Sequence, residues 1–109
     1  MGRGSNKELP VITKVKTPYK PKGEMYAVVR EMSGGSRFKA LCEDGKTRMI
    51  RIGGRLKKKM WVRPLDYIII KKWVVQADRK ADLIYRYTKS ELNFLLRKGL
   101  IPEILQGVQ

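Results

Sequence analysis

A run of lysines and arginines lies in the middle of the chain, and no acidic residue interrupts it. The run contains Arg48, Arg51, Arg55, Lys57, Lys58, Lys59 and Arg63, with Trp61 near its end. Lysine and arginine neutralise phosphates, arginine also binds phosphate oxygens through its planar fork, and an indole ring can stack on an unpaired base. An unmixed positive run beside an aromatic residue therefore favours contact with a nucleic acid over a solvated face.

The charge of the whole chain agrees with this interpretation. The 109 residues include 25 Lys plus Arg against 10 Asp plus Glu, which gives a formal net charge of +15. An excess of this size indicates a polyanionic partner. The length suits one domain, which can bury roughly 60 to 70% of its unfolded surface without a metal or disulfide staple.

Several kinds of catalytic and structural site are excluded by composition. The chain has no histidine and one cysteine, Cys42. Zinc fingers, Cys/His nucleophiles and disulfide frameworks are therefore ruled out together. Asp78, Asp82 and Glu91 could suggest a magnesium or acid/base site, but two of these carboxylates lie beside Lys80 without a pocket signature, and we expect them to solvate a turn. We predict a protein that is not an enzyme and needs no cofactor.

The sequence also lacks the patterns of membrane insertion or export. It has no run of about 18 apolar residues and no charged-then-apolar start. We expect a soluble protein with no membrane partner, in a reducing compartment, which means the cytoplasm.

The elements that must position the basic run begin after a glycine- and proline-containing segment. Residues 1–22 show no sustained period and predict a flexible basic arm. Residues 24–32 and 36–44 then alternate as strands, with Cys42 on the apolar face. A tight turn at residues 43–46, with Gly45 able to take positive φ, returns the chain as a third strand over 47–52.

The basic loop GGRLKKKMWVRPLD joins this hairpin to a fourth strand, which should begin only after Pro64 because proline cannot donate to a ladder. In the fourth strand, over 66–75, three consecutive isoleucines at 68–70 predict burial on both faces, as in a closed barrel with something packed on it. Residues 76–79 form a turn. A fifth strand follows over 80–88, with Ala81, Leu83, Tyr85 and Tyr87 expected on one face.

The period then changes from two to 3.6. Thr88 or Ser90 can cap a helix whose apolar stripe contains Leu92, Leu95 and Leu96, and Gly99 suits the position after its end. Pro102 prevents the helix from continuing, and Ile101 and Leu105 are expected to pack on the barrel.

These elements predict a mainly β fold: a five-stranded oligonucleotide/oligosaccharide-binding (OB) barrel over residues 23–88, followed by a short C-terminal helix and a tail over 89–109 packed on the barrel. OB barrels bind single strands by combining a cationic groove with aromatic platforms. An SH3-like barrel would fit the strand count nearly as well, so periodicity alone leaves both topologies open.

Three motifs resemble one known family. The run GGRLKKKMWVRP is similar to the basic loop of archaeal and eukaryotic translation initiation factor 1A. ALCEDGKTRMIRI resembles the Cys-x-Asp-Gly hairpin of that family, and DRKADLIYRYT resembles its Asp-x-Lys-Ala-Asp segment followed by an apolar strand. The motifs fall in the family's order and spacing between Glu24 and Pro102. The archaeal form fits better, because the chain stops at Gln109 without the acidic tail of eukaryotic members.

The resemblance implies an OB barrel with a helical addition and a non-enzymatic role. Family members bind the small ribosomal subunit at the aminoacyl-tRNA decoding site through its rRNA, and assist initiator tRNA recruitment and start-codon selection. The implied partners are therefore the subunit rRNA, initiator tRNA and other initiation factors, with a monomer when free. The family's rRNA-contacting positions match Arg37, Arg48, Arg51, Arg55, Lys57, Lys58, Lys59 and Trp61.

Two positions depart from the family and several alternatives stay open. Gly53 stands where eukaryotic members carry Arg, and Leu65 replaces the glycine usual in the archaeal Arg-Pro-Gly-Asp turn. Trp61 could stack on RNA or pack in the barrel mouth, whereas packing is favoured for Trp73. The rival functions are a structural ribosomal protein, a general single-stranded RNA-binding OB protein, and a nuclease, for which clustered carboxylates are missing.

Overall fold

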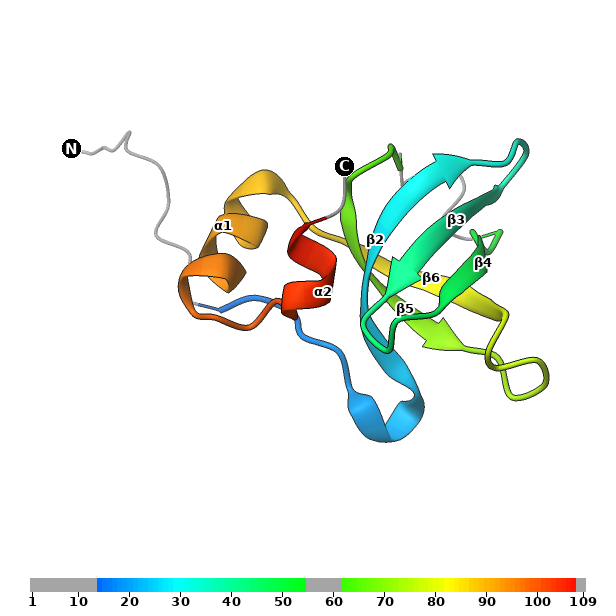
Figure 1. Cartoon of the computed structure of the whole chain (residues 1–109), viewed down its shortest axis with the longest axis horizontal. Coiled ribbons are helices and arrows are strands. Elements are labelled where there is room, and N and C mark those ends of the chain that lie inside the picture. The colour runs from blue at the N-terminus through cyan, green and yellow to red at the C-terminus, as the bar shows by residue number, and fades with distance from the viewer. Residues whose placement is uncertain (1–13, 55–61, 108–109) are drawn as a thin grey trace.

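A computed structural model describes residues 14–54 and 62–107. In chain order the elements are η1 Lys20–Lys22, β2 Glu24–Met32, β3 Arg37–Cys42, β4 Thr47–Arg51, β5 Tyr67–Lys72, β6 Lys80–Arg86, α1 Lys89–Arg97 and α2 Glu103–Gln106 (Figure 1). Both α-helices lie on one side of the barrel, and the β5–β6 connection projects on the other side. No helix in the described part of the chain is long and apolar enough to span a membrane.

The strands close a barrel in the order β2-β3-β4-β6-β5, with β5 returning to β2. All neighbours are antiparallel except β4 and β6, which pair in parallel because the chain crosses the barrel between them. β6 and β5 thus close the barrel between β4 and β2. The predicted five-stranded OB barrel with a short C-terminal helix is confirmed, and the SH3-like alternative is set aside.

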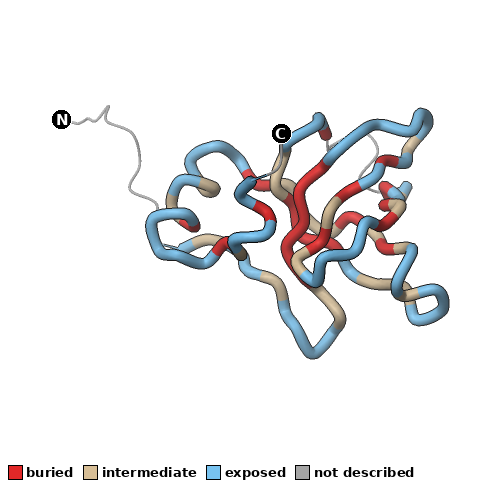
Figure 2. Tube along the Cα trace, in the orientation of Figure 1, coloured by how far each residue is buried: buried red, intermediate tan, exposed pale blue. Residues whose placement is uncertain are grey.

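Buried residues are concentrated in the strands of the barrel, as the red parts of the tube in Figure 2 show. The apolar cluster of the interior consists of Met25, Ala27, Val29, Phe38, Ala40, Cys42, Ile50, Ile52, Val62, Ile68, Ile70, Ala81 and Leu83. Cys42 is a buried free thiol, as its position in the alternating strand predicted. Burial raises the pKa of this thiol, so it acts as a small apolar side chain.

A second apolar cluster joins the outside of the barrel to the two helices. Ile68 and Ile70 face the interior, whereas Ile69 faces this outer cluster, so all three are fully buried as predicted. The other buried members are Tyr26, Val28, Tyr87, Leu95, Ile101 and Leu105. The Tyr67 hydroxyl donates to the Leu105 carbonyl at 2.7 Å, which fixes the last turn against β5.

The prediction that Ala81, Leu83, Tyr85 and Tyr87 share one face of the fifth strand is wrong beyond Leu83. Ile70 pairs with Leu83, but the next residue on β5, Ile69, pairs with Tyr85, so one extra residue bulges from β6. A bulge reverses the alternation that follows it. Tyr85 and Tyr87 therefore contact the helix-side cluster instead of joining Ala81 in the interior.

The predicted helix is present with both of its termini specified. The Thr88 hydroxyl accepts from the Glu91 backbone N–H at 3.2 Å, and the Glu91 carboxylate accepts from the Thr88 N–H at 2.9 Å. This reciprocal capping box satisfies two backbone donors that the first turn leaves free. After the helix, Gly99 takes φ +69, a conformation that glycine adopts without strain.

The described part of the predicted flexible arm is in contact with the barrel. Residues 1–13 lie outside the described part of the chain, but from Lys14 onward the segment is placed. Val15 packs on the helix-side cluster, and the Tyr87 hydroxyl donates to the Lys16 carbonyl. Lys20 forms an ion pair with Glu43. Residues 15, 16 and 20 of the predicted arm therefore contact the folded part of the chain, and the boundary at residue 22 stays a prediction.

Candidate nucleic-acid interface

Two of the predicted RNA-binding residues lie side by side on the outer surface of the barrel. Arg37 at the start of β3 is directly opposite Arg51 at the end of β4, and both are exposed. Like charges placed opposite each other on neighbouring strands destabilise a sheet. The pair is therefore suited to an anionic partner, which would remove the repulsion.

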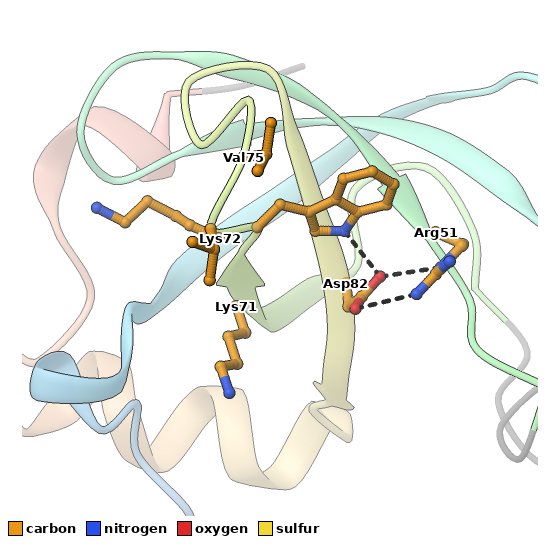
Figure 3. Close-up of a pocket in the computed structure, with 7 residues that line it drawn as sticks. Arg51, Lys71, Lys72, Val75 and Asp82 are labelled. Atoms are coloured by element: carbon orange, nitrogen blue, oxygen red, sulfur yellow. Dashed lines mark hydrogen bonds and ion pairs between the residues drawn. The ribbon is translucent and has the colours of Figure 1, made fainter.

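Arg51 belongs to a network of hydrogen bonds that extends to the neighbouring strand (Figure 3). Its Nε and Nη2 donate to the two Asp82 carboxylate oxygens at 3.1 and 3.3 Å. Asp82 also accepts the indole N–H of Trp73 at 3.0 Å. One carboxylate thus orients an arginine and a tryptophan together, and the Arg51 guanidinium carbon lies 5.1 Å from the Trp73 ring centroid.

Trp73 is positioned by the tight connection between β5 and β6. Its backbone N–H donates to the Lys80 carbonyl at 3.1 Å, and Gln76 accepts from two residues further along while taking φ +62. The strand predicted to reach residue 75 ends at Lys72, because the chain turns here. Packing in the core, favoured from sequence for Trp73, is wrong: the residue is half-buried and belongs to neither apolar cluster.

A shallow groove of about 440 Å³ opens beside this network. Trp73, Val75, Lys71 and Lys72 contribute to its walls, and the two lysine side chains extend away from the indole ring in Figure 3. Sequence reasoning did not include these residues in the site. The signal that could have found them is their place in the connection between the fourth and fifth strands, one of the loops with which OB barrels bind their ligands.

Arg48 lies inside the protein, where an RNA partner would not reach it. Only 1% of its surface is exposed, since it shares the inward face of β4 with Ile50. Its Nη1 and Nη2 form a fork with Asp44 at 2.9 and 2.8 Å, and its Nε donates to the Ala77 carbonyl at 2.6 Å. Arg48 therefore ties the β3–β4 turn to the β5–β6 connection. The predicted direct contact between Arg48 and RNA is therefore corrected. Arg48 has a structural role, because its Nε, Nη1 and Nη2 atoms already donate hydrogen bonds within the fold.

The ion pair with Arg48 also favours the ionised form of the Asp44 carboxyl group. Hydrogen bonds from the Arg48 guanidinium lower the pKa of Asp44, and the same bonds raise the pKa of Arg48. Both groups are therefore charged at neutral pH. Arg48 and Asp44 form a neutralised pair, so Arg48 adds no free positive charge to the surface.

The other predicted contacts, Arg55, Lys57, Lys58, Lys59 and Trp61, lie outside the described residues. The flanks of this segment are fixed. On one side the Ile52 N–H donates to the Ser36 carbonyl at 2.9 Å, and on the other side Val62 is buried in the barrel interior. Ile52 and Val62, which flank the segment in sequence, are therefore both held on the barrel.

The described residues do not assemble a metal centre. Within 14–54 and 62–107, no three His, Cys, Asp or Glu side chains are grouped so that they could hold an ion. Asp82 is occupied by Arg51 and Trp73, and Glu91 is occupied by the helix cap and by the Tyr85 hydroxyl at 2.7 Å. The arrangement can bind an anion and present an aromatic ring.

Comparison with known proteins agrees with this chemistry. The family model described as Translation initiation factor 1A / IF-1 matches residues 13–107. Translation initiation factor 1A of Picrophilus torridus is 50% identical over 92 residues, covering 84% of each chain. The proteins of the same name from Thermoplasma acidophilum and Thermoplasma volcanium are 47% and 45% identical, covering 86% and 92% of this chain and 78% and 80% of their own. The chain therefore belongs to the translation initiation factor 1A family, and its role lies in the initiation of translation.

Proposed function

We propose that this protein binds the small ribosomal subunit at the aminoacyl-tRNA decoding site through rRNA contacts. From that position it assists initiator tRNA recruitment and start-codon selection. It acts in the cytoplasm by binding rather than by catalysis, needs no cofactor, and is a monomer when free. Its partners are the subunit rRNA, initiator tRNA and other initiation factors.

The observation that carries the proposal is the acid-free basic segment between β4 and β5. Arg55 and Lys57 to Lys59 are followed by Trp61 in a connection that is too long and too charged for a simple turn. The exposed Arg37 and Arg51 pair extends the positive surface onto the barrel. Phosphates supply affinity to such a surface, and Trp61 offers a face to an unpaired base.

The proposed mechanism is steric and electrostatic. The basic segment enters the decoding region, occupies the aminoacyl-tRNA site and stabilises a subunit conformation that accepts initiator tRNA in the neighbouring site. Neutralised phosphates hold the barrel in register on the RNA.

A structural ribosomal protein and a general single-stranded RNA-binding protein are the competing functions. A factor should dissociate from purified small subunits in high salt, whereas a structural protein should remain bound through extensive rRNA contacts. Chemical footprinting of the subunit with and without protein separates the factor from the general binder. We expect protection confined to the decoding site, and protection scattered over many single-stranded regions would contradict the proposal.

The basic segment is tested by reversing two of its charges. Lys57→Glu/Lys58→Glu should weaken binding to small subunits and leave thermal unfolding nearly unchanged. Lys89→Glu/Lys98→Glu is the matched control, because it changes the net charge equally on exposed positions at the two ends of α1. Equal binding by the first variant and the unmodified protein would remove the segment from the interface.

A further inference from the structure

Asp82 is an acidic residue on the basic surface of the barrel, and the proposed function gives it no role. It lies opposite Arg51 on β4 and opposite Lys71 on β5, so two cations flank it across the sheet. A carboxylate in this place repels the phosphates that the surface is proposed to bind. A second effect of Asp82 must offset this repulsion if the surface is to bind RNA well.

The contribution of Asp82 to folding stability is small. The side chains of Arg51 and Asp82 are 55% and 37% exposed. Water screens an ion pair at this exposure, and such pairs add little to the free energy of unfolding. Asp44 offers the contrast, because the side chain of its partner Arg48 is only 1% exposed. The fold therefore depends much more on the Arg48 pair than on the Arg51 pair.

The pair instead fixes the orientation of Arg51 (Figure 3). Its Nε donates to Asp82 Oδ1 at 3.1 Å, its Nη2 donates to Oδ2 at 3.3 Å, and its guanidinium carbon lies 5.1 Å from the Trp73 ring centroid. Asp82 is held in turn, because its Oδ1 also accepts the indole N–H of Trp73 at 3.0 Å. A long side chain at the exposed end of a strand is thereby kept in one place.

One edge of the Arg51 guanidinium is left for a ligand. The bonds to Asp82 use Nε and Nη2, and no residue within 14–54 and 62–107 bonds to Nη1. A guanidinium has five N–H donors, so Nη1 and the second N–H of Nη2 form a fork that matches two phosphate oxygens. Asp82 and a phosphate can therefore bind Arg51 at the same time, on different edges.

We propose that Asp82 is a positioning residue for RNA binding: it holds Arg51 by one edge, so that a phosphate of the ribosomal RNA meets an arginine that is already ordered. This inference rests on the proposed function and deepens it at Arg51. An arginine that must be ordered on binding loses conformational freedom, and avoiding that loss strengthens binding by about 2- to 13-fold. The rival role is competition, in which Asp82 occupies Arg51 and weakens its contact with phosphate.

A double-mutant cycle on small-subunit binding separates the two roles. The affinity of the full chain for purified small subunits is measured at one salt concentration for the unmodified protein, Asp82→Asn, Arg51→Gln and the double variant. Asparagine keeps one acceptor oxygen for the Trp73 N–H but replaces the other by an NH2 group, which cannot accept from Arg51. The repulsion of phosphate is removed in both backgrounds, so the cycle isolates the effect that passes through Arg51.

Positioning and competition predict opposite signs in this cycle. The change caused by Asp82→Asn should be less favourable to binding, by about 2- to 13-fold, when Arg51 is present than in the Arg51→Gln background. A difference of the opposite sign would show competition. No difference would show that the two residues do not act together, and either result overturns the proposal.

Glu31→Gln is the matched control for the loss of one acid. Glu31 is also exposed and paired with a cation on the neighbouring strand, since its carboxylate lies 3.7 Å from the Lys39 amine. It should change subunit binding by the same factor with and without Arg51. A coupling between Glu31 and Arg51 as large as that of Asp82 would attribute the effect to overall charge and contradict the proposal.

Arg51→Lys tests the same inference with Asp82 unchanged. Lysine keeps the positive charge, but one ammonium group cannot hold a carboxylate on one edge and a phosphate on another. Arg51→Lys should therefore weaken subunit binding, and Asp82→Asn should add little further loss in the Arg51→Lys protein. Equal affinity of Arg51→Lys and the unmodified protein would count against positioning even if Asp82→Asn unfolds.

The unmodified protein separates this inference from the proposed function. If it protects the decoding site of small subunits and the cycle shows no coupling between Asp82 and Arg51, only the inference at Asp82 fails. If it does not bind small subunits, the proposed function fails and the inference fails with it.

Discussion

At the scale of single residues, Leu65 shows how a sequence departure is accommodated. The Asp66 N–H donates to the Arg63 carbonyl at 3.1 Å, and Leu65 takes φ +73 as the third residue of this turn. With Pro64 before it, the turn has the pattern in which glycine is preferred at that position. The family's usual glycine conformation is therefore kept, and leucine adopts it at a steric cost of roughly 1–2 kcal/mol.

Leu65→Gly should consequently raise the free energy of unfolding by about 0.5–1 kcal/mol, after the extra flexibility of glycine in the unfolded chain is subtracted. Chemical denaturation measures the change. Leu65→Ala is the matched control, because alanine removes the same exposed side chain but retains the Cβ. An equal gain for alanine would attribute the effect to the lost leucine and not to φ.

Asp44 and Arg48 give a pH-dependent prediction at the same scale. Arg48 lowers the pKa of Asp44 in the folded protein, so the pair stabilises the fold above the unfolded pKa of about 3.9 and loses that contribution as the pH falls through the lower folded value. Asp44→Asn leaves the Arg48 charge buried without its partner. It should cost about 2–3 kcal/mol at pH 7, discounted because Asp44 is partly exposed.

Denaturant titrations of the unmodified protein and of Asp44→Asn between neutral and acid pH check this expectation. The difference between them should shrink as the pH falls below the unfolded pKa of Asp44. Asp78→Asn provides the comparison, since Asp78 is an exposed acid in the β5–β6 connection that Arg48 supports. A difference that stays constant with pH would show that lost packing, not the ion pair, causes the effect.

At the scale of elements, the capping box determines how α1 begins. Thr88→Ala removes the hydroxyl that accepts from the Glu91 N–H and should lower the free energy of unfolding by about 0.5–2 kcal/mol. Thr88→Ser retains the acceptor and should restore most of it. Thermal unfolding followed by circular dichroism measures both variants. If serine and alanine are equally destabilised, the Thr88 methyl group rather than the cap is responsible.

Elements also explain the connection between the two apolar clusters. The bulge after Leu83 turns Tyr85 and Tyr87 toward the helices, where the rings pack edge to face with centroids 5.3 Å apart. The Glu91 carboxylate that completes the helix cap also accepts the Tyr85 hydroxyl, and this bond raises the pKa of Tyr85 to about 12. The helix is therefore anchored to β6 through the same residue that caps it.

At the scale of the whole molecule, the net charge of +15 should make RNA binding depend strongly on salt. About four phosphate contacts predict a slope near −3 for log affinity against log salt, from roughly −0.7 per phosphate on single strands. Lys57→Glu/Lys58→Glu should flatten the slope by removing contacts. The Lys89→Glu/Lys98→Glu control changes the same net charge, so equal flattening would implicate the overall charge and not the basic segment.

The sequence by itself determined the strand pattern, the capped helix, the buried isoleucines and the positive charge, because alternation, capping residues and composition are local properties. Only the tertiary structure decided that Arg48 is internal and Trp73 is at the surface. Arg48 follows the apolar face of β4, yet its partners Asp44 and Ala77 come from two different connections. The local sequence predicts Trp73 as a core residue. Closure of the barrel instead brings Asp82 to the indole N–H of Trp73 and places Arg51 beside Asp82. Contacts between strands distant along the chain depend on the parallel pairing of β4 with β6, and no local pattern specifies that register.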